Sequence, residues 1–597
     1  MSKKIHFTFI LLFLTISSGS IYSQSSKSYK YKPIAGSETG KANINSQPSK
    51  STYTEDNKFQ RYTTEGGYPV EFSSFYLSSY YDHQSNGSPN QIWQDPWNPE
   101  NVHTAVMVLP VFGGTRSVYY IPSTDKGLTW TNFGSIDNAE SGYPSINGFS
   151  DGSAIITMQT TAGGISVARS QVFTDIGPVF GSFSRFDPGL SGASSLIWGR
   201  LLATQNISNP KKWILTASQN APDGEAYTIT QSDLIPPGAF SQWQSYPANN
   251  SEQYCLAIGA DGRIGNAYIA RGAADLGDVM FRESFDQGLT WTVPVKIFDA
   301  NLARDTLSAF GGISMVYLGN IPCVTFEVSV FDGVNLYPGS PSYIYFWKRD
   351  LNYGLAGKIA GPDNVPFYPN TGPEDSYGGY TSLCRPVIGK PDNSNSMLFI
   401  AMNAATSQTA SDSNVYYATY FMAFFDNGSH WTTPERITPQ TPLKDYRYVS
   451  MSTTNSQNEV NNGWIIQMTV QTHDYAGTFA PNQPPGPSDI QSMRLDFSLW
   501  TANSENIKIP EGISLKQNSP NPFNPVTDLE FKISKTEFVS LKVYDVSGRE
   551  VKTIVNKELN AGNYKYSFDA SGLTSGIYFY TLKTNGSNIT KRMLLLK

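Results

Sequence analysis

The sequence predicts an all-β protein in which a large region of repeated strand units precedes a small antiparallel β-sandwich. Aromatic residues make up 13% of the chain, and 50 glycines and 37 prolines supply frequent turns. Between residues 61 and 500, short runs of aromatic and β-branched residues alternate with clusters of Gly, Asn, Asp and Pro, which is the pattern of strands joined by turns. The apolar spacing of an amphipathic helix is absent from this region, so we expect strands throughout.

The N-terminus predicts export. Lys3 and Lys4 precede an apolar run from Ile5 to Ile16, and small polar residues follow, with a cleavage point before Gln24. This is the pattern of a secretory signal peptide, which we predict over residues 1–23. The apolar run is shorter than the ~20 residues of a membrane-spanning helix and no comparable run follows it, so we expect no transmembrane segment.

Residues 24–60 are rich in Ser, Lys, Thr, Asn and Gly and contain few large apolar side chains. Such a segment cannot bury enough apolar surface to offset its loss of conformational entropy on ordering. We therefore expect a disordered leader between the signal peptide and the first folded region.

Composition argues against several classes of partner. The net charge of −6 gives no electrostatic reason to expect nucleic acid. The five histidines show no metal-ligand spacing, and neither phosphate-loop nor hydrolase motifs occur, so we expect neither a metal site nor a cofactor. Cys255, Cys323 and Cys384 each lie in or beside an apolar stretch, which favours buried small side chains; one disulfide plus a free thiol is the alternative.

An eight-residue motif occurs twice in full. Ser123–Trp130 and Ser284–Trp291 both fit the pattern Ser/Thr-x-Asp-x-Gly-x-Thr-Trp, and Phe425–Trp431 keeps its Asp, Gly and Trp. An Asp side chain can bond the backbone of a tight turn, Gly accepts positive φ there, and Trp can pack beneath it, so the motif predicts a stapled hairpin. The residues given this structural role are Ser123, Asp125, Gly127, Trp130, Ser284, Asp286, Gly288, Trp291, Asp426, Gly428 and Trp431.

These residues are those of the Asp box, or BNR repeat, and the region resembles the sialidase-like β-propellers that carry it. A turn of the form Asp-Pro-x-Asn-Pro at Asp95–Pro99 adds to the likeness. The resemblance implies that the Asp boxes lie on outer turns, away from a catalytic pocket, so their aspartates are not expected to act as acids.

Strand clusters recur at intervals of about fifty residues, the length of a four-stranded propeller blade. We therefore predict one closed β-propeller over residues 61–500, with seven blades and with six or eight as alternatives. The predicted starts of the inner strands are Val102, Tyr143, Leu196, Tyr254, Ile313, Tyr380 and Tyr448.

A polar linker at residues 501–512 leads to a C-terminal domain at residues 513–597. Alternating residues in Val539–Tyr544 predict a half-buried strand, and several such runs predict a small antiparallel, immunoglobulin-like sandwich. The motifs Asn521–Pro525 (Asn-Pro-Phe-Asn-Pro) and Val543–Val551 and the basic tail before Met593 resemble type A sorting domains of the type nine secretion system. The resemblance implies that outer-membrane secretion machinery is a partner of residues 513–597. It also implies passage from the periplasm across the outer membrane, often with removal of this domain and attachment to the cell surface.

Candidate ligand-binding residues lie where inner strands are predicted to begin, because these positions rim one mouth of a propeller's channel. At four of them an acid stands just ahead of an aromatic residue, and paired carboxylates there could hydrolyse glycosides while tyrosines stack on sugar rings. Turn-forming acids and solvated rim aromatics are the structural alternative. Two nearby arginines could grip a substrate carboxylate. The rim candidates are Glu140, Tyr143, Glu252, Tyr254, Asp375, Tyr380, Arg385, Asp445 and Arg447.

Two functions are compatible with this sequence. The first is a secreted or surface propeller that binds glycan or protein ligands without catalysis. The second is a secreted sialidase-like glycoside hydrolase, for which Arg385 and Arg447 would supply two of the three arginines that the resemblance requires. The Arg-Ile-Pro segment that usually supplies the first arginine is absent before the first Asp box, so the catalytic residues stay unassigned and the binding function is favoured.

Overall fold

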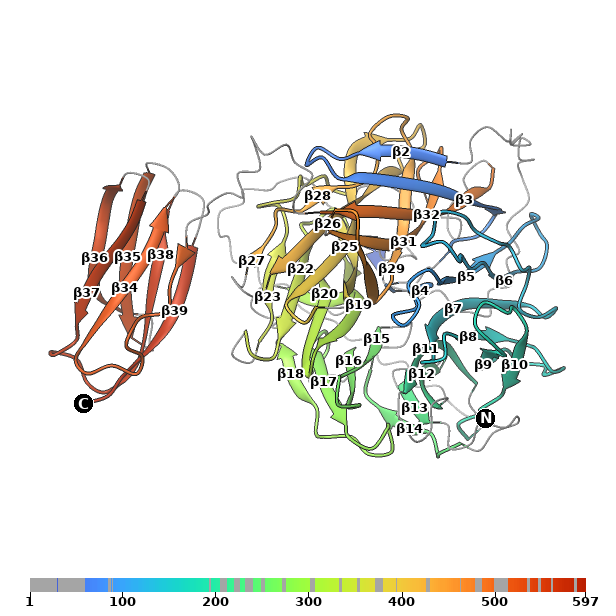
Figure 1. Cartoon of the computed structure of the whole chain (residues 1–597), viewed down its shortest axis with the longest axis horizontal. Helices are drawn as coiled ribbons and strands as arrows, with labels where there is room; N and C mark the ends of the chain where they lie inside the picture. Colours follow the sequence, from blue (N-terminus) through green and yellow to red (C-terminus); the bar gives the residue numbers. More distant parts are fainter. Residues whose placement is uncertain are drawn as a thin grey trace, which may run out of the picture. The chain divides into compact units, whose positions relative to one another are not determined.

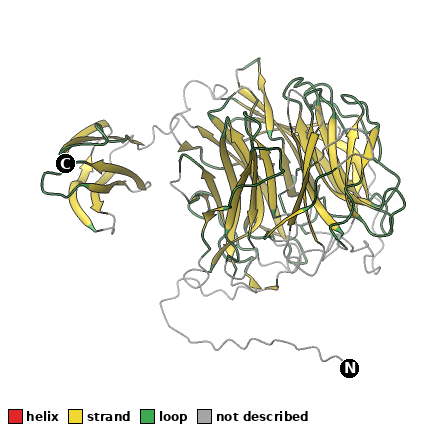
Figure 2. Ribbon diagram, turned by 90° about the horizontal axis from the view of Figure 1, so that it is seen from below, coloured by secondary structure: helices red, strands yellow, loops and turns green. Residues whose placement is uncertain are grey.

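The structure is a computed structural model of the 597-residue chain. It describes residues 29–30, 59–83, 87–88, 90–192, 195–204, 212–219, 226–230, 240–248, 253–270, 275–300, 306–331, 335–351, 355–370, 380–392, 394–425, 430–461, 463–477, 486–498, 514–533, 537–545, 549–559, 562–584 and 588–597. The described secondary structure consists of strands and contains no helix (Figure 2). Accordingly, no helix in the described ranges could cross a membrane.

The chain divides into two compact units, Met1–Thr501 and Ala502–Lys597 (Figure 1). The two units together make the protein all-β, as predicted. The first unit contains the strand sets of a β-propeller, and the second is a sandwich of short antiparallel strands. The boundaries of the leader, propeller, linker and sorting domain stay predictions.

Most of the first unit consists of small antiparallel sheets whose strands follow one another in sequence. A three-stranded sheet contains β4 (Ile92–Gln94), β5 (Val102–Val108) and β6 (Ser117–Tyr120). Four four-stranded sheets follow. The first two contain β7 (Ser141–Gly148), β8 (Ala154–Thr160), β9 (Arg169–Asp175) and β10 (Phe183–Phe186), and then β11 (Leu196–Thr204), β12 (Lys212–Gln219), β13 (Ala226–Thr230) and β14 (Gln244–Tyr246). The next two contain β15 (Tyr254–Ile258), β16 (Ile264–Ile269), β17 (Val279–Ser284) and β18 (Val295–Phe298), and then β19 (Leu307–Leu318), β20 (Ile321–Val330), β22 (Tyr343–Lys348) and β23 (Gly357–Ala360).

The last two sets are joined by a short parallel pairing. One contains β24 (Leu383–Pro391), β25 (Met397–Thr409) and β26 (Val415–Phe425), with β27 (His430–Trp431) and β28 (Glu435–Arg436) both paired to β26. The other contains β29 (Asp445–Met451), β31 (Gly463–His473), β32 (Ser488–Phe497), β3 (Pro69–Ser79) and β2 (Phe59–Thr63). Between them, β30 (Thr454–Asn458) pairs with β31 and with β24. Outside these sets, β1 (Tyr29–Lys30) pairs with β21 (Asn335–Leu336).

The sets form a closed ring. The first strand of each set contacts the first strand of the next, in the order β4, β7, β11, β15, β19, β24 and β29, and β29 contacts β4. Strand β3 pairs with β32, so the two ends of the region share one sheet, which Figure 1 shows as blue strands beside orange ones. The ring of described strands supports a count of seven blades, which stays a prediction.

One predicted inner strand is wrong. Val102 begins β5, the second strand of its set, because the inner strand β4 has only three residues and ends at the turn that follows Gln94. In that turn the Trp97 amide donates to the Asp95 carboxylate at 2.8 Å, and the Asn101 amide donates to the Asn98 carbonyl at 2.9 Å. The predicted starts at Leu196 and Tyr254 match the first residues of β11 and β15.

Apolar side chains fill the space between neighbouring sets. Tyr317 and Val324, for example, lie in one cluster with residues of β15 to β18, and Phe346 lies in another with residues of β24 to β26. Cys255, Cys323 and Cys384 form no disulfide; Cys323 and Cys384 are fully buried, as expected for small core side chains, and Cys255 is half-buried.

Both full copies of the repeated motif form the same turn. The Asp125 carboxylate accepts from the Thr129 amide at 2.8 Å, from the Thr129 hydroxyl at 2.6 Å and from the Ser123 hydroxyl at 2.7 Å. Asp286 makes the same three bonds at 2.8, 2.6 and 2.8 Å. The glycine amide donates to the serine hydroxyl in each copy, and Gly127 and Gly288 have φ of 79° and 88°, where a Cβ would be strained.

The tryptophans of these turns are half-buried. Trp130 packs edge-on against Phe75 with ring centroids 5.0 Å apart, and Trp291 lies under the Arg282 guanidinium. Of the third copy, Asp426 and Gly428 lie outside the described residues, while Trp431 packs against Phe424 at 5.0 Å. The two described turns are held by local hydrogen bonds, as a structural role requires.

Replacing Asp125 with alanine should lower the free energy of unfolding by about 2 kcal/mol, because three hydrogen bonds to one carboxylate are lost together. Burial alone would raise the pKa of Asp125, but hydrogen bonds from Thr129 and Ser123 outweigh it and hold the pKa below its ordinary value. The stabilisation is therefore present above the unfolded pKa of about 4 and is lost as the pH falls through the folded value. Urea denaturation at pH 7 and pH 3 measures both effects; an alanine variant that lost as much stability at pH 3 as at pH 7 would contradict this account.

The second unit is built from β33 (Ser514–Leu515), β34 (Val526–Ile533), β35 (Glu537–Asp545), β36 (Glu550–Leu559), β37 (Gly562–Asp569), β38 (Gly576–Lys583) and β39 (Asn588–Leu595). They form two antiparallel sheets, of order β33-β34-β37 and β36-β35-β38-β39. Leu529, Leu541, Tyr580 and Met593 are fully buried in one core shared by both sheets. The segment expected only as a basic tail is thus an edge strand, β39.

Candidate ligand-binding site

The inner strands carry a recurring irregularity near their first residues. The register shifts after Gly142 in β7, Ile197 in β11, Ala309 in β19, Cys384 in β24 and Arg447 in β29. In each bulge one residue has a left-handed φ between 52° and 56°: Tyr143, Trp198, Gly312, Arg385 and Tyr448.

A non-glycine residue at positive φ is strained, and bulges near functional sites redirect side chains. Strands β7, β11, β19, β24 and β29 share this bulge, whereas β15 pairs with β16 without a register shift. The bulges lie near the first residues of these inner strands, at the end of the ring where the strands begin. This end is the candidate site.

Two arginines and three tyrosines form the larger cluster at this end. The Arg385 guanidinium lies 4.3 Å from the Tyr380 ring centroid, and the Arg447 guanidinium lies 4.7 Å from it. Arg447 also lies 4.4 Å from the Tyr417 centroid, and Tyr448 packs edge-on against Tyr380 at 5.4 Å. We call these five residues the Tyr380 cluster; its cation–π contacts stabilise charges that are removed from water.

Two acids, Asp445 and Glu327, bind residues of the Tyr380 cluster. The Arg447 Nε donates to Asp445 Oδ2 at 2.7 Å, and the same carboxylate accepts from the amides of Tyr417 and Gly477 at 2.7 and 3.0 Å. Glu327 is fully buried, and burial raises the pKa of its carboxyl. It accepts from the Thr381 hydroxyl at 2.6 Å and from the Arg385 amide at 3.2 Å.

A second, smaller cluster contains Arg116. Its guanidinium lies 5.1 Å from the Tyr81 ring centroid and 5.4 Å from that of Tyr143, and the two tyrosine hydroxyls are 3.2 Å apart. It forms an ion pair with Glu140 at 3.5 Å, in which the arginine side chain is buried while the glutamate side chain is 41% exposed. Glu140 therefore presents a carboxylate to solvent from a rigid support.

The segment between β3 and β4 links the two clusters. Tyr81 belongs to the Arg116 cluster, while the Gly87 carbonyl accepts from Arg385 at 3.1 Å. The Ser88 hydroxyl donates to the Pro386 carbonyl at 2.6 Å, and its carbonyl accepts from Arg200 at 2.7 Å. The described residues of this segment thus contact three inner strands, β7, β11 and β24.

The structure brings some of the predicted rim residues together and places others apart. Tyr380, Arg385 and Arg447 share one cluster, with Asp445 beside it, and Tyr143 and Glu140 share the other. Tyr254 lies elsewhere, where its hydroxyl donates to the Trp198 carbonyl at 2.8 Å. Glu252 and Asp375 lie outside the described residues.

One expectation about the tyrosines needs correction. Tyr143, Tyr254 and Tyr380 are fully buried, so their rings contact protein groups and present no face to a sugar. Their hydroxyls contact protein groups: Tyr143 contacts the Tyr81 hydroxyl, Tyr254 donates to the Trp198 carbonyl, and Tyr380 accepts from the Tyr448 amide. Ligand binding by the rim residues stays a prediction.

Sequence reasoning missed Arg116, Tyr417 and Glu327. The first two lie at the start of strands outside the inner ring, where the sequence shows no distinguishing pattern. Glu327 had a usable signal, since it is the one acid in the otherwise apolar and small-residue run Cys323–Val330. Among the described residues, no group of three or more His, Cys, Asp or Glu side chains is arranged to hold a metal ion.

Residues 519–596 match the family described as the secretion system C-terminal sorting domain. A search of curated proteins finds no match to the chain. Solved structures similar to it include a fungal alcohol oxidase of the AA5 family in complex with copper, with 9% identity, 86% of this chain and 98% of that chain covered, and a TM-score of 0.38. The NanB sialidase from Streptococcus pneumoniae is similar with 12% identity, 70% of this chain and 70% of that chain covered, and a TM-score of 0.35. An α-L-arabinanase from Penicillium chrysogenum is similar with 10% identity, 56% of this chain and 97% of that chain covered, and a TM-score of 0.34.

The C-terminal unit is therefore a sorting domain of the type nine secretion system. Proteins with this domain pass through the periplasm and are placed on the cell surface or released, and this protein is one of them. The domain also identifies the secretion machinery as a partner of the C-terminal unit.

Proposed function

We propose that the first unit is a non-catalytic binding module that the sorting domain delivers to the cell surface. Its ligand is a glycan or a surface protein, bound at the end of the ring where the inner strands begin. The observation that carries this proposal is the state of Arg385 and Arg447. Both are almost fully buried and bonded within the protein, Arg447 to Asp445 and Arg385 to the Gly87 carbonyl.

This observation weighs against a sialidase-like reaction. Such an enzyme needs arginines open to the substrate carboxylate, because a planar guanidinium grips it through two parallel bonds. Breaking the Arg447–Asp445 pair to admit a substrate would leave a buried carboxylate uncompensated. The two arginines are better suited to holding the inner strands in place, while Glu140 faces solvent.

A glycan array and a panel of surface proteins, tested with the mature chain, will identify the ligand class. Replacing Glu140 and Glu252 with glutamine should then weaken binding on the order of tenfold, or about 1.4 kcal/mol, because charge is removed and shape is kept. The matched control is Asp125→Asn, which should lower stability and leave affinity unchanged. Loss of affinity in the control at unchanged fold, with normal binding by the rim variant, would place the functional face elsewhere.

Hydrolysis is the second candidate function, and Glu327 favours it. Burial raises the pKa of the Glu327 carboxyl, and a raised pKa is a property that general acids share. Any glycan hit should therefore be assayed for cleavage by the mature chain and by Glu327→Gln. Turnover that the variant abolishes without a change in ligand affinity would replace the binding proposal with this one.

A further inference from the structure

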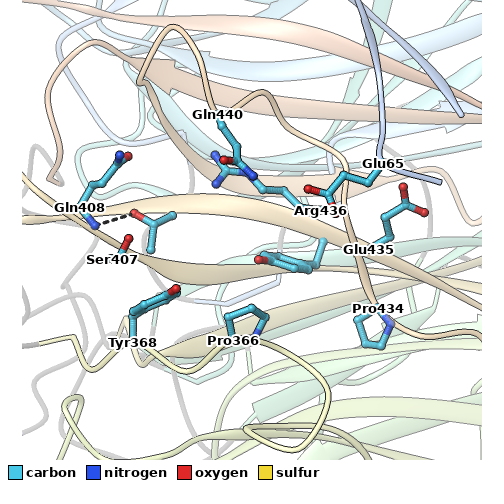
Figure 3. Close-up of a pocket in the computed structure, with 11 residues that line it drawn as sticks. Glu65, Pro366, Tyr368, Ser407, Gln408, Pro434, Glu435, Arg436 and Gln440 are labelled. Carbon is cyan, nitrogen blue, oxygen red and sulfur yellow. Dashed lines mark hydrogen bonds between the residues drawn. The ribbon is translucent and has the colours of Figure 1, made fainter. Parts of the chain in front are cut away.

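A pocket in the first unit shares no lining residue with the candidate site already described. Its volume is about 330 Å³, and three parts of the chain line it: the turn between β2 and β3, the segment after β23, and strands β25, β26 and β28 with their loops (Figure 3). The lining residues are Glu65, Pro366, Tyr368, Thr406, Ser407, Gln408, Tyr420, Pro434, Glu435, Arg436 and Gln440. None of them belongs to the Tyr380 or Arg116 clusters.

Three charged side chains line this pocket without pairing among themselves. Arg436 Nε donates to the Thr438 carbonyl at 2.9 Å, and Arg436 Nη2 donates to the Pro439 carbonyl at 2.8 Å. These bonds fix the guanidinium and leave its third nitrogen available. The Glu435 carboxylate accepts from the Gly66 amide, while Glu65 makes no hydrogen bond or ion pair with any described residue.

Aromatic and uncharged polar side chains form the rest of the wall. In Figure 3 Tyr368 and Pro366 lie along the lower side of the pocket, Ser407 and Gln408 lie at the left, and Gln440 lies at the top. Tyr368 is exposed, and Tyr420 is half-buried, with burial raising the pKa of its hydroxyl. An exposed ring beside amide, hydroxyl, carboxylate and guanidinium groups offers stacking together with many donors and acceptors.

We propose that this pocket is a second binding site that takes a non-acidic sugar unit, neutral or amino-substituted. Sugar rings present an apolar face to an aromatic side chain and adjacent hydroxyls to planar polar groups, and both are available here. The pocket lies near the lower limit of about 300 Å³ for ligand sites, so it fits one or two rings.

Charge decides the class of sugar. Glu65 and Glu435 contribute two negative charges and Arg436 one positive charge, which leaves the pocket with a formal charge of −1. A uronate or sialic acid would be repelled by the two carboxylates, whereas a neutral hydroxyl or an ammonium group would be accepted by them. The site does not depend on the proposed function of the ring's central end, because the two share no residue.

The test uses the full mature chain on an array of neutral, amino-sugar and uronate-terminated glycans. Two variants, Tyr368→Ala and the double variant Glu65→Gln/Glu435→Gln, remove the stacking surface and the acceptors separately. We expect each to lose about tenfold of its affinity for neutral or amino-sugar glycans, corresponding to about 1.4 kcal/mol. Glu459→Gln, in an exposed turn outside both proposed sites, should retain this binding.

Several outcomes would overturn the proposal. These are the absence of any bound neutral or amino-sugar glycan, unchanged binding by both pocket variants, and a uronate glycan whose binding the pocket variants abolish. Thermal denaturation of each variant separates loss of the site from loss of the fold, because a variant that keeps the parent's melting temperature and loses affinity has lost the site alone. Binding that is lost in Glu140→Gln and kept in the pocket variants would support the proposed function and refute this second site.

Discussion

Replacing Asp445 with alanine is expected to lower the free energy of unfolding of the first unit by about 3–5 kcal/mol, the cost of breaking one side of a buried ion pair. Asp445 and Arg447 side chains are 2% and 3% exposed, and their 2.7 Å contact joins the two charges directly. Without the carboxylate, the guanidinium keeps its charge against Tyr380 and Tyr417, and the amides of Tyr417 and Gly477 lose their acceptor.

Tryptophan fluorescence in urea measures this loss selectively, because all 11 tryptophans lie at or before Trp500 and so report on the first unit alone. The matched control is Asp474→Ala. Asp474 also pairs with a cation, Lys444 at 3.2 Å, but its side chain is 74% exposed, so its loss should change stability by less than about 1 kcal/mol. Equal effects of the two substitutions would show that the Asp445–Arg447 pair does not stabilise the ring.

The fold was predictable where its causes are local. The two turns of the repeated motif follow from hydrogen bonds within a few residues of Asp125 and Asp286, and such bonds can be recognised in a sequence pattern. The pairing of β3 with β32 could not be predicted in this way, because Val70 aligns with Leu495 across almost the whole unit. The short inner strand β4 was missed because three residues carry no measurable alternation.

The candidate site was predictable only in part. Residues at the same position of successive units, such as Arg385 and Arg447, were expected to converge, and they share the Tyr380 cluster. The burial of the tyrosines was not predictable, since Tyr143 and Tyr448 lie in bulges with φ of 53° and 56° and Tyr143 contacts Tyr81, which is distant in sequence. Arg116 could not be predicted either, because its partners Tyr81 and Glu140 are distant in sequence and become neighbours only in the folded ring.

Deleting Ala502–Lys597 is expected to abolish delivery to the cell surface and to leave a folded first unit in the periplasm. The sorting domain is confined to this unit, and the first unit closes its ring with its own strands β3 and β32. Fractionation of the native host into periplasm, outer membrane and medium, followed by immunoblotting, measures the location. Protease resistance of the periplasmic fraction checks that the truncated chain is folded.

Point substitutions separate loss of the sorting fold from loss of chain length. Leu541 in β35 is fully buried among residues of both sheets, so Leu541→Ala should destabilise the second unit by about 2–5 kcal/mol and reduce surface delivery. Phe538→Ala, three residues earlier on the same strand, removes a side chain that is 49% exposed and should leave delivery unchanged. This prediction takes the folded surface of the sandwich, which persists only while the core under it is intact, as the feature that the secretion machinery recognises. Normal delivery of the truncated chain would show that sorting information lies outside the second unit. Equal delivery of the Leu541→Ala and Phe538→Ala variants would show that the folded sandwich is not what the machinery recognises.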